Sequence, residues 1–360
     1  MPEQKKFFLH KPQINISYSS IGRMWLVFFC AFACVIQSAL SDGGISLIPA
    51  FTALVFAIFI EFLLTWKKYG ASKIKDGSAA ATAMILAIML PNQIPPIYAA
   101  LGAVFAIAVV KHSFGGLGSN WLNPALGGWL FINISWSRAF SEALGGAADA
   151  ITEIGGTTDI SALDNSVTEI LNSSVFSIVG VQLPSGYIDL LFYNGPGIIA
   201  DRGLFFLLIG TIFITATVIN RGWIPLVFLA VFGFLVKLAG DMSLAWNGDI
   251  LYGIFSGGTI AAAFILAAEP ASSAKLRSGV LITVILGAVL SWFFRYKCSE
   301  YLGCFFALAL VNCFIPLVKM IEERFFLLHK NNGKVQAASG ESAGRQFKEK
   351  SGASYKENIV

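Results

Sequence analysis

The chain has 360 residues, of which 56% are hydrophobic and 13% are charged, and its formal net charge is +4. An ordinary soluble domain has a smaller apolar share and about twice this share of charged residues. The composition therefore excludes a soluble domain and indicates an integral membrane protein, surrounded by lipid and without a nucleic-acid partner.

A polar, basic segment, residues 1–23, precedes the first apolar run and is predicted to lie in the cytoplasm. No clear small-residue cleavage site follows it, so the first membrane span is expected to be retained. The apolar runs after it are long enough to cross, or nearly cross, a hydrocarbon core of about 30 Å. These runs are 24–41, 46–66, 95–110, 203–220, 223–240, 278–296 and 301–318.

Three further apolar stretches are shorter or interrupted: 78–90, 121–136 and the glycine-punctuated 250–268. As a helix, 78–90 would reach only about 20 Å, so it is predicted to be a half-helix that ends inside protein. With these three, the sequence predicts ten membrane spans.

The distribution of basic residues predicts the orientation of these spans. Loops on the cytoplasmic side of a membrane protein carry an excess of Lys and Arg. An N-terminus inside the cell places most of the 25 Lys and Arg residues on that side, and both termini are then cytoplasmic. The outer side receives only Arg138, Arg202, Arg295 and Lys297.

Two Gly/Ala/Thr-rich stretches of equal length end in proline, GSAAATAMILAIMLP (77–91) and SGGTIAAAFILAAEP (256–270). Each would be the third span of a five-span unit, 24–136 and 203–320, and an odd number of spans makes successive units inverted. Chance similarity is the alternative, because small residues are common in packed membrane helices. The predicted fold class is an all-α integral membrane protein with about ten transmembrane helices, arranged as two inverted five-helix repeats with short or broken helices.

Besides residues 1–23, two segments lie outside these units. Residues 137–202 are acidic and are predicted to be extracytoplasmic. Residues 321–360 form a cytoplasmic tail, and from about residue 331 it has too few apolar residues to order itself.

The stretch HSFGGLGSNWLNPA (112–125) interrupts two apolar runs with residues that weaken helices. Irregular backbone at membrane depth is tolerated only where protein shields it or where it lines a polar cavity. A ligand or ion is therefore expected beside it, and the alternative is a tight cytoplasmic turn in which Asn123 caps the next helix. The candidate binding residues are Gly115, Gly116, Gly118, Asn120 and Asn123.

Glu61 is the acidic residue placed deepest in a predicted span, about 9 Å of helix before Lys67. Intramembrane acids are candidates for function, so an ion path or a quinone-adjacent role is predicted for it. The alternative is a carboxylate that reaches up to Lys67 or Lys68. His112 is expected to be a surface histidine, and no catalytic or metal-ligating residue is predicted.

Four segments resemble one protein family. GGLGSNWLNPA (115–125) closely resembles the GGLGxNxFNPA signature of the D subunit of the Rnf electron-transport complex and the B subunit of the sodium-pumping NADH:quinone oxidoreductase. KDGSAAATAMILAIMLP (75–91) is similar to a second family segment, and the residues in step with it are Asp76, Ser78 and Thr82.

The other two segments lie further along the chain. YIDLLFYNGPGIIADRG (187–203) resembles the family's Y-x-D-L-F-x-G-N-x-P-G segment. FSGGTIAAAFILAAEP (255–270) resembles its second glycine-rich stretch, which adds Gly257 and Gly258 as candidates and has Glu269 where Asp is usual. The resemblance extends from about residue 15 to residue 325.

The resemblance implies a subunit of a redox complex in the bacterial inner membrane, inactive alone, which transfers electrons through flavins coupled to Na⁺ or H⁺ translocation. Its implied partners are flavin-bearing and iron–sulfur subunits and a flavin transferase. The short segment before the first span favours the ferredoxin- and NAD-linked Rnf complex over the quinone reductase. A ten-helix channel or secondary transporter without a redox role is the alternative of a different class.

The resemblance also implies an FMN joined through its phosphate to a threonine hydroxyl in the outer segment. The first candidate is Thr168, in Asn165-Ser166-Val167-Thr168, and the second is Thr158, in Gly155-Gly156-Thr157-Thr158. A second, non-covalent flavin (riboflavin) is left open.

Overall fold

The computed structural model describes residues 20–69, 75–113, 120–144, 169–170, 173–174, 187–193, 197–217, 221–241, 248–270, 272–274 and 276–324. Within these ranges the fold is helical throughout, as predicted, and contains no strand. Among the described residues, the one extended pairing is an isolated antiparallel bridge between Pro91 and Ile198.

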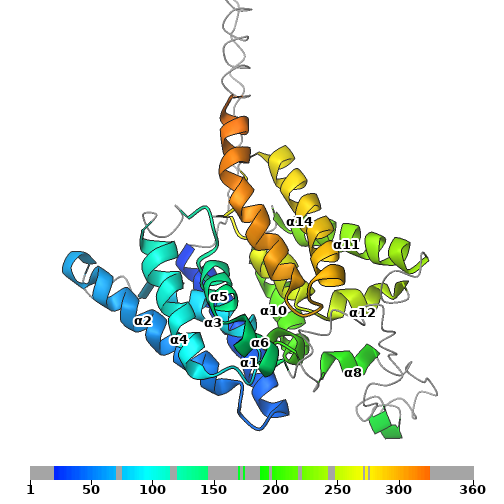
Figure 1. The fold of residues 1–360 in the computed structure, drawn as a ribbon, viewed down its shortest axis with the longest axis horizontal. Coiled ribbons are helices and arrows are strands. Elements are labelled where there is room, and N and C mark those ends of the chain that lie inside the picture. The colour runs from blue at the N-terminus through cyan, green and yellow to red at the C-terminus, as the bar shows by residue number, and fades with distance from the viewer. Residues whose placement is uncertain are drawn as a thin grey trace, which may run out of the picture.

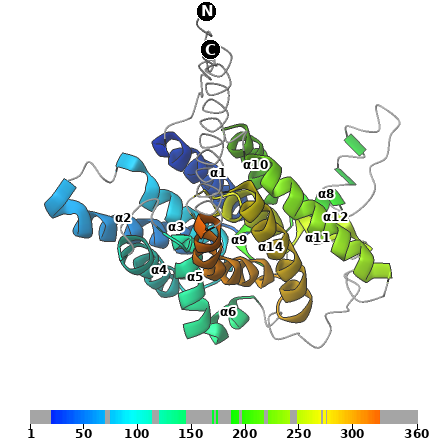
Figure 2. The ribbon, with the colours of Figure 1, turned by 90° about the horizontal axis from the view of Figure 1, so that it is seen from above.

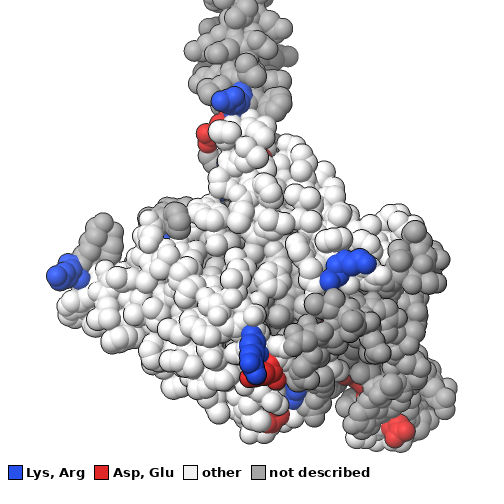
Figure 3. Space-filling view, in the orientation of Figure 1, with Lys and Arg blue, Asp and Glu red and all other residues white. Residues whose placement is uncertain are grey.

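Five described helices are long and apolar enough to cross a membrane. They are α1 (Ser20–Ser41), α2 (Leu47–Tyr69), α11 (Trp223–Asp241), α14 (Arg277–Lys297) and a last helix, Gly303–Arg324. Large apolar side chains point outward from them, among them Phe51, Phe234 and Ile282, each more than 60% exposed. The face in Figure 3 carries few, scattered charged groups. The chain is therefore a multi-pass membrane protein, because only hydrocarbon would solvate such a surface.

Shorter helices lie between the long ones. They are α3 (Ser78–Ile88), α4 (Pro96–Phe105), which continues as the π-helix η2 (Ala106–His112), α5 (Pro124–Ser135), α6 (Ser137–Ala143), α8 (Tyr187–Leu191), α9 (Ile199–Arg202) and α10 (Leu204–Thr217).

The predicted run 250–268 is broken into α12 (Ile250–Phe255), α13 (Thr259–Ala261) and the π-helix η8 (Ala262–Leu266). The break falls at Gly257 and Gly258, whose φ angles are +58° and +64°. Only glycine adopts this left-handed backbone without steric cost, so the two glycines end α12 and allow a new helix to begin.

The helices form two groups that meet along α1. In Figures 1 and 2, α2 to α5 lie on one side and α10 to α14 on the other. Helix α1 packs against both α3 and α10. Small residues allow the close approach to α10, since a Cβ on Gly210 would lie 2.7 Å from the Cβ of Cys30.

Candidate functional site

Glu61 lies at the centre of a buried polar cluster, here called the Glu61 network. The side chains of Glu61 and Lys111 are 0% and 1% exposed, and Glu61 Oε2 is 3.0 Å from Lys111 Nζ. His112 Nε2 lies 2.9 Å from the same oxygen. Lys111 and His112 stand at the end of η2. The last turn of this π-helix therefore directs two basic groups at one carboxylate on α2.

Lys111 also connects this carboxylate to the start of α3. Its Nζ donates to Ser78 Oγ at 2.7 Å. Ser78 in turn donates through its backbone N–H and its hydroxyl to Asp76 Oδ1, at 2.8 and 2.7 Å. Between them, Gly77 has a φ of +70°, and a Cβ there would lie 2.9 Å from the Trp25 ring. The turn before α3 thus needs glycine both for its conformation and for its contact with α1.

One sequence-based interpretation is wrong in this region, and another holds only in part. The alternative in which the Glu61 carboxylate reaches Lys67 or Lys68 fails, because this carboxylate pairs with Lys111 and His112. The expectation of a surface position for His112 holds only in part, because its side chain is 24% exposed and also contacts Glu61.

Thr82 is the remaining candidate of the segment 75–91. Its hydroxyl donates to the carbonyl of Ser78 at 2.8 Å, a contact within helix α3.

The two asparagines of the interrupted stretch tie it to both groups of helices. With its amide nitrogen turned toward them, Asn120 donates to the carbonyls of Val110 and Lys111, 3.2 Å away. Asn123 Oδ1 accepts from two backbone N–H groups at the start of α5, so it is the helix cap that the alternative interpretation predicted. Its Nδ2 donates to Glu269 Oε2 at 2.7 Å, after η8.

Asn123 and Glu269 border a cavity of about 360 Å³ between the two groups of helices. Its other polar lining residues include Arg23 and Arg221. The apolar part of the lining includes Met24, Leu26, Val27, Ile85, Ile214, Pro225, Phe264, Ile265, Ala268 and Pro270. A mainly apolar pocket of this size with a few convergent polar groups is typical of a site for a small organic molecule.

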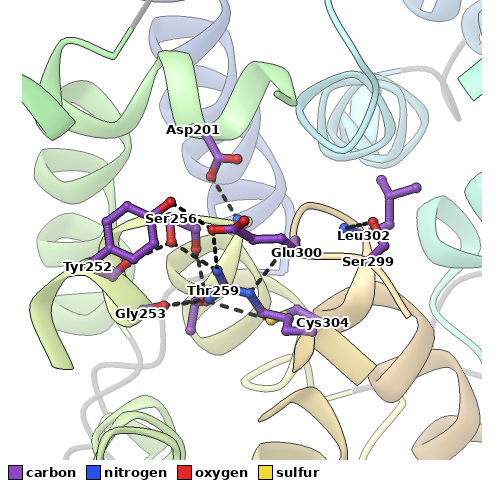
Figure 4. A network of polar contacts seen from close by, with 11 residues as sticks. Asp201, Tyr252, Gly253, Ser256, Thr259, Ser299, Glu300, Leu302 and Cys304 are labelled. Atoms are coloured by element: carbon purple, nitrogen blue, oxygen red, sulfur yellow. Dashed lines mark hydrogen bonds and ion pairs between the residues drawn. The ribbon is translucent and has the colours of Figure 1, made fainter. Parts of the chain in front are cut away.

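A second buried cluster, here called the Arg295 network, lies where α12 breaks (Figure 4). Arg295 is 0% exposed. Its Nη1 donates to the Gly253 carbonyl at 2.5 Å and to Thr259 Oγ1 at 2.7 Å, and its Nη2 donates to Ser256 Oγ at 2.9 Å. Its Nε donates to the Glu300 carbonyl at 2.9 Å. The guanidinium therefore holds the broken helix to the turn after α14.

Two carboxylates belong to this network. Glu300 accepts a 2.8 Å hydrogen bond from the Tyr252 hydroxyl, and its Oε1 is 3.9 Å from Arg295 Nη2. Asp201, on α9, accepts a 2.8 Å hydrogen bond from the Gly258 backbone N–H (Figure 4). A Cβ on Gly257 would approach the Glu300 carbonyl oxygen and lie 2.6 Å from the Arg295 guanidinium carbon. The predicted candidates Gly257 and Gly258 are thus required by their backbone conformation, and Gly257 also by its packing against Arg295.

The Glu61 and Arg295 networks share one plan. A buried basic side chain near the end of a helix, Lys111 or Arg295, donates at 2.7 Å to the hydroxyl of Ser78 or Thr259. Each hydroxyl residue begins a helix directly after a glycine of positive φ.

Sequence reasoning missed both basic residues because it counted them as loop charges that fix the orientation. Their positions in or beside apolar runs were the available signal, since a charge at membrane depth needs a partner.

Several predicted residues lie outside the described part of the chain. These are Gly115, Gly116, Gly118, Thr158 and Thr168.

Comparison with known proteins places the chain in one family. The model described as the NQR2, RnfD, RnfE family matches residues 8–326. The chain is 25% identical to the D subunit of the proton-translocating ferredoxin:NAD(+) oxidoreductase complex of Clostridium ljungdahlii, over 85% of this chain and 91% of that protein. It is 29% identical to the D subunit of the Na(+)-translocating ferredoxin:NAD(+) oxidoreductase complex of Acetobacterium woodii, over 73% and 77%. It is 28% identical to the D subunit of the ion-translocating oxidoreductase complex of Escherichia fergusonii, over 82% and 90%.

Proposed function

The chain belongs to the NQR2, RnfD, RnfE family, and on that premise we propose that it is the D-type membrane subunit of an Rnf-type, ion-translocating ferredoxin:NAD⁺ oxidoreductase. The observation that carries this proposal is the family match across residues 8–326. Relatives named as the D subunit of such complexes, each similar over most of its length, support the Rnf type. The chain acts with flavin-bearing and iron–sulfur partner subunits rather than alone.

Within this complex the chain carries FMN, attached by a flavin transferase as a phosphoester of Thr168, or of Thr158 as the second choice. The resemblance of the chain to the family supports an attachment site in the outer segment, and Asn165-Ser166-Val167-Thr168 departs from the family's S-G-A-T pattern, with Val167 in place of Ala. A bound flavin would supply one- and two-electron transfer, and the protein would hold and tune it.

We propose the cavity of about 360 Å³ beside Asn123 as the site of a second, non-covalent flavin. The apolar lining suits the faces of an aromatic ring system, and Asn123 and Glu269 offer hydrogen bonds to its polar edge. Arg23 and Arg221 would lie near any polar tail at the rim. The chain's own contribution is to orient the ring and keep water from it.

We extend the proposal to architecture. Ten spans form two inverted five-helix repeats, with both termini in the cytoplasm of a bacterium and the spans in its inner membrane. The repeats are supported by the common plan of the Glu61 and Arg295 networks, each built on a glycine of positive φ, a hydroxyl and a basic side chain. Discontinuous helices that meet inside such repeats are typical of proteins that move ions.

Glu61 is a station on the ion path in this proposal. It is 0% exposed, and its Oε1 has no hydrogen-bond partner among the described residues. A buried carboxylate whose second oxygen is available can accept a proton or join the ligands of a small cation.

The experiment is a deletion of the chain followed by complementation, assayed in inverted membrane vesicles. Complemented vesicles are expected to reduce NAD⁺ with reduced ferredoxin and to accumulate Na⁺ or H⁺, and deleted vesicles are expected to do neither. Reduction of quinone by NADH instead would favour the related sodium-pumping quinone reductase. Solute movement by the purified chain alone, without flavin, would favour a channel or secondary transporter and contradict the proposal.

A further inference from the structure

We propose that Asp201 is the second station of the ion path, a site for one monovalent cation, either H⁺ or Na⁺, in the Arg295 network. The inference rests on the proposed function and deepens it, because it names a residue through which the translocated ion would pass after Glu61.

The carboxylate of Asp201 is enclosed but only half satisfied. Its residue is 4% exposed, and its Oδ1 accepts the 2.8 Å hydrogen bond from the Gly258 N–H. Its Oδ2 is buried and has no hydrogen-bond partner among the described residues. The Gly257 amide faces the carboxylate without completing a hydrogen bond to that oxygen. In Figure 4 the second oxygen points away from the rest of the network. A buried acceptor of this kind is costly unless it binds something.

The charges of the network leave room for one more positive charge. Asp201 and Glu300 are two carboxylates beside the single guanidinium of Arg295. Arg295 attracts Asp201 electrostatically, but the hydrogen bonds of its guanidinium go to the loop and helix ends around Gly253, Ser256, Thr259 and Glu300. With both carboxylates ionised, the two negative charges exceed the one positive charge of Arg295. Glu300 is 23% exposed and Asp201 is enclosed, so a proton or a sodium ion at Asp201 would neutralise the buried charge.

Asp201 titrates in the pH range in which a carboxyl group can take up and release a proton near neutrality. Burial raises its pKa to about 7, while the Gly258 N–H and Arg295 act in the opposite direction. Such a group exchanges a proton near neutral pH, and a cation that binds there competes with that proton. The charged and titratable groups that face Asp201 from the elements around it are Arg295, Glu300, Tyr193, Cys34 and Cys304.

The position of Asp201 relative to Glu61 suits a path with two stations. Near the start of α1, Trp25 packs on Gly77, which adjoins the Glu61 network. Nine residues later Cys34 donates through its thiol to the carbonyl of Ile199, two residues before Asp201. The two carboxylates are therefore associated with different depths of α1, about 14 Å apart along its axis. An ion that left one would still have to cross part of the membrane to reach the other.

The test uses the purified whole complex and compares wild type with Asp201→Asn and, as a matched control, Glu142→Gln. Glu142 is an exposed acid paired with Arg138 on α6. Infrared difference spectra are recorded across neutral pH, first in choline chloride and then with NaCl at the same ionic strength. Wild type and Glu142→Gln are expected to show a protonated carboxyl band that titrates near pH 7, and Asp201→Asn is expected to lack it.

A shift of this titration to lower pH in NaCl identifies Na⁺ as the ligand, and no shift identifies the proton. In liposomes, Asp201→Asn is expected to reduce coupled cation uptake to the uncoupled background. An infrared titration and an uptake that are both unchanged in Asp201→Asn would overturn the inference. If Asp201→Asn does not assemble, Asp201→Glu is measured in its place. The carboxyl band of Asp201→Glu is expected to titrate at a different pH from that of wild type, and an unchanged titration would overturn the inference.

A different result would contradict the proposed function itself: a wild-type complex that does not transfer electrons from ferredoxin to NAD⁺.

Discussion

Lys111 Nζ lies 3.0 Å from Glu61 Oε2, and both side chains are buried. The pair joins the end of the π-helix η2 to the middle of α2, so the carboxylate expected to serve an ion path already has an internal cation beside it. Lys111 is shared with Ser78 Oγ, 2.7 Å away. A translocated cation that binds Glu61 would therefore have to compete with this ammonium group for the carboxylate or displace it.

Removing that ammonium group should destabilise the protein strongly. Lys111→Met removes the lysine from the buried Glu61 carboxylate and leaves His112 as its basic neighbour among the described residues. Breaking one side of a buried ion pair costs about 3–5 kcal/mol. The double variant Lys111→Met/Glu61→Gln carries no uncompensated charge and is expected to recover most of this loss. Thermal denaturation of the purified complex measures both variants.

The control is Lys67→Met, at an exposed position on α2, which is expected to change stability by less than about 0.5 kcal/mol. Equal stability of Lys111→Met and wild type would show that the pair has no energetic role.

Replacing Gly257 by alanine should destabilise the protein more than replacing Gly43 by alanine. Both have positive φ, +58° and +68°, so alanine is strained at either by about 1–2 kcal/mol. A Cβ at Gly257 would also lie 2.6 Å from the Arg295 guanidinium carbon, whereas a Cβ at Gly43 would meet nothing within 4 Å. Gly257→Ala is therefore expected to lower the melting temperature clearly more than Gly43→Ala. Equal losses would mean that the Arg295 network tolerates displacement.

Asn123→Ser should separate helix capping from ligand binding. Serine caps helix N-termini about as well as asparagine, so α5 is expected to form. Serine cannot reach Glu269, whose Oε2 receives the 2.7 Å hydrogen bond from Asn123 Nδ2. We expect the variant complex to assemble but to release less non-covalent flavin on denaturation, measured by fluorescence after filtration.

The control is Asn133→Ser. Asn133 is a buried asparagine of α5 that does not line the cavity, so this variant is expected to retain the flavin. A wild-type complex without filterable flavin would contradict the assignment of the cavity.

Asp201 should make the stability of the protein fall as the pH rises. Burial raises its pKa from 3.8 to about 7, so between these values the folded protein keeps a proton that the unfolded chain has released. Stability then declines with increasing pH and the contribution is lost once the pH passes about 7. The melting temperature of wild type is expected to fall relative to that of Asp201→Asn over this range. A constant difference between the two proteins at all pH values would mean that Asp201 does not titrate there.

The helices could be predicted from the sequence because long apolar runs at membrane depth have few alternatives to a helix. The glycines of 250–268 indicated an interrupted stretch, and the structure places the break at Gly257 and Gly258. Glu61 was recognisable as an intramembrane acid, and Asn123 as a helix cap.

The partners of these residues were not foreseeable. Lys111 is 50 residues from Glu61, and Glu269 is 146 residues from Asn123, so each pair depends on helix packing rather than on local spacing. Arg295 was mistaken for a loop charge because its acceptors, the Gly253 carbonyl and the Thr259 hydroxyl, come together only where α12 breaks.

Covalent flavin on this chain is the most direct test of the account. The chain is expressed with a flavin transferase, purified, and run on a denaturing gel under ultraviolet light, beside Thr168→Ala and Thr158→Ala. The account predicts a fluorescent band at the mass of the chain that is lost in Thr168→Ala and retained in Thr158→Ala. A wild-type chain without fluorescence, from cells in which the transferase labels another substrate, would contradict its role as a flavin-bearing redox subunit.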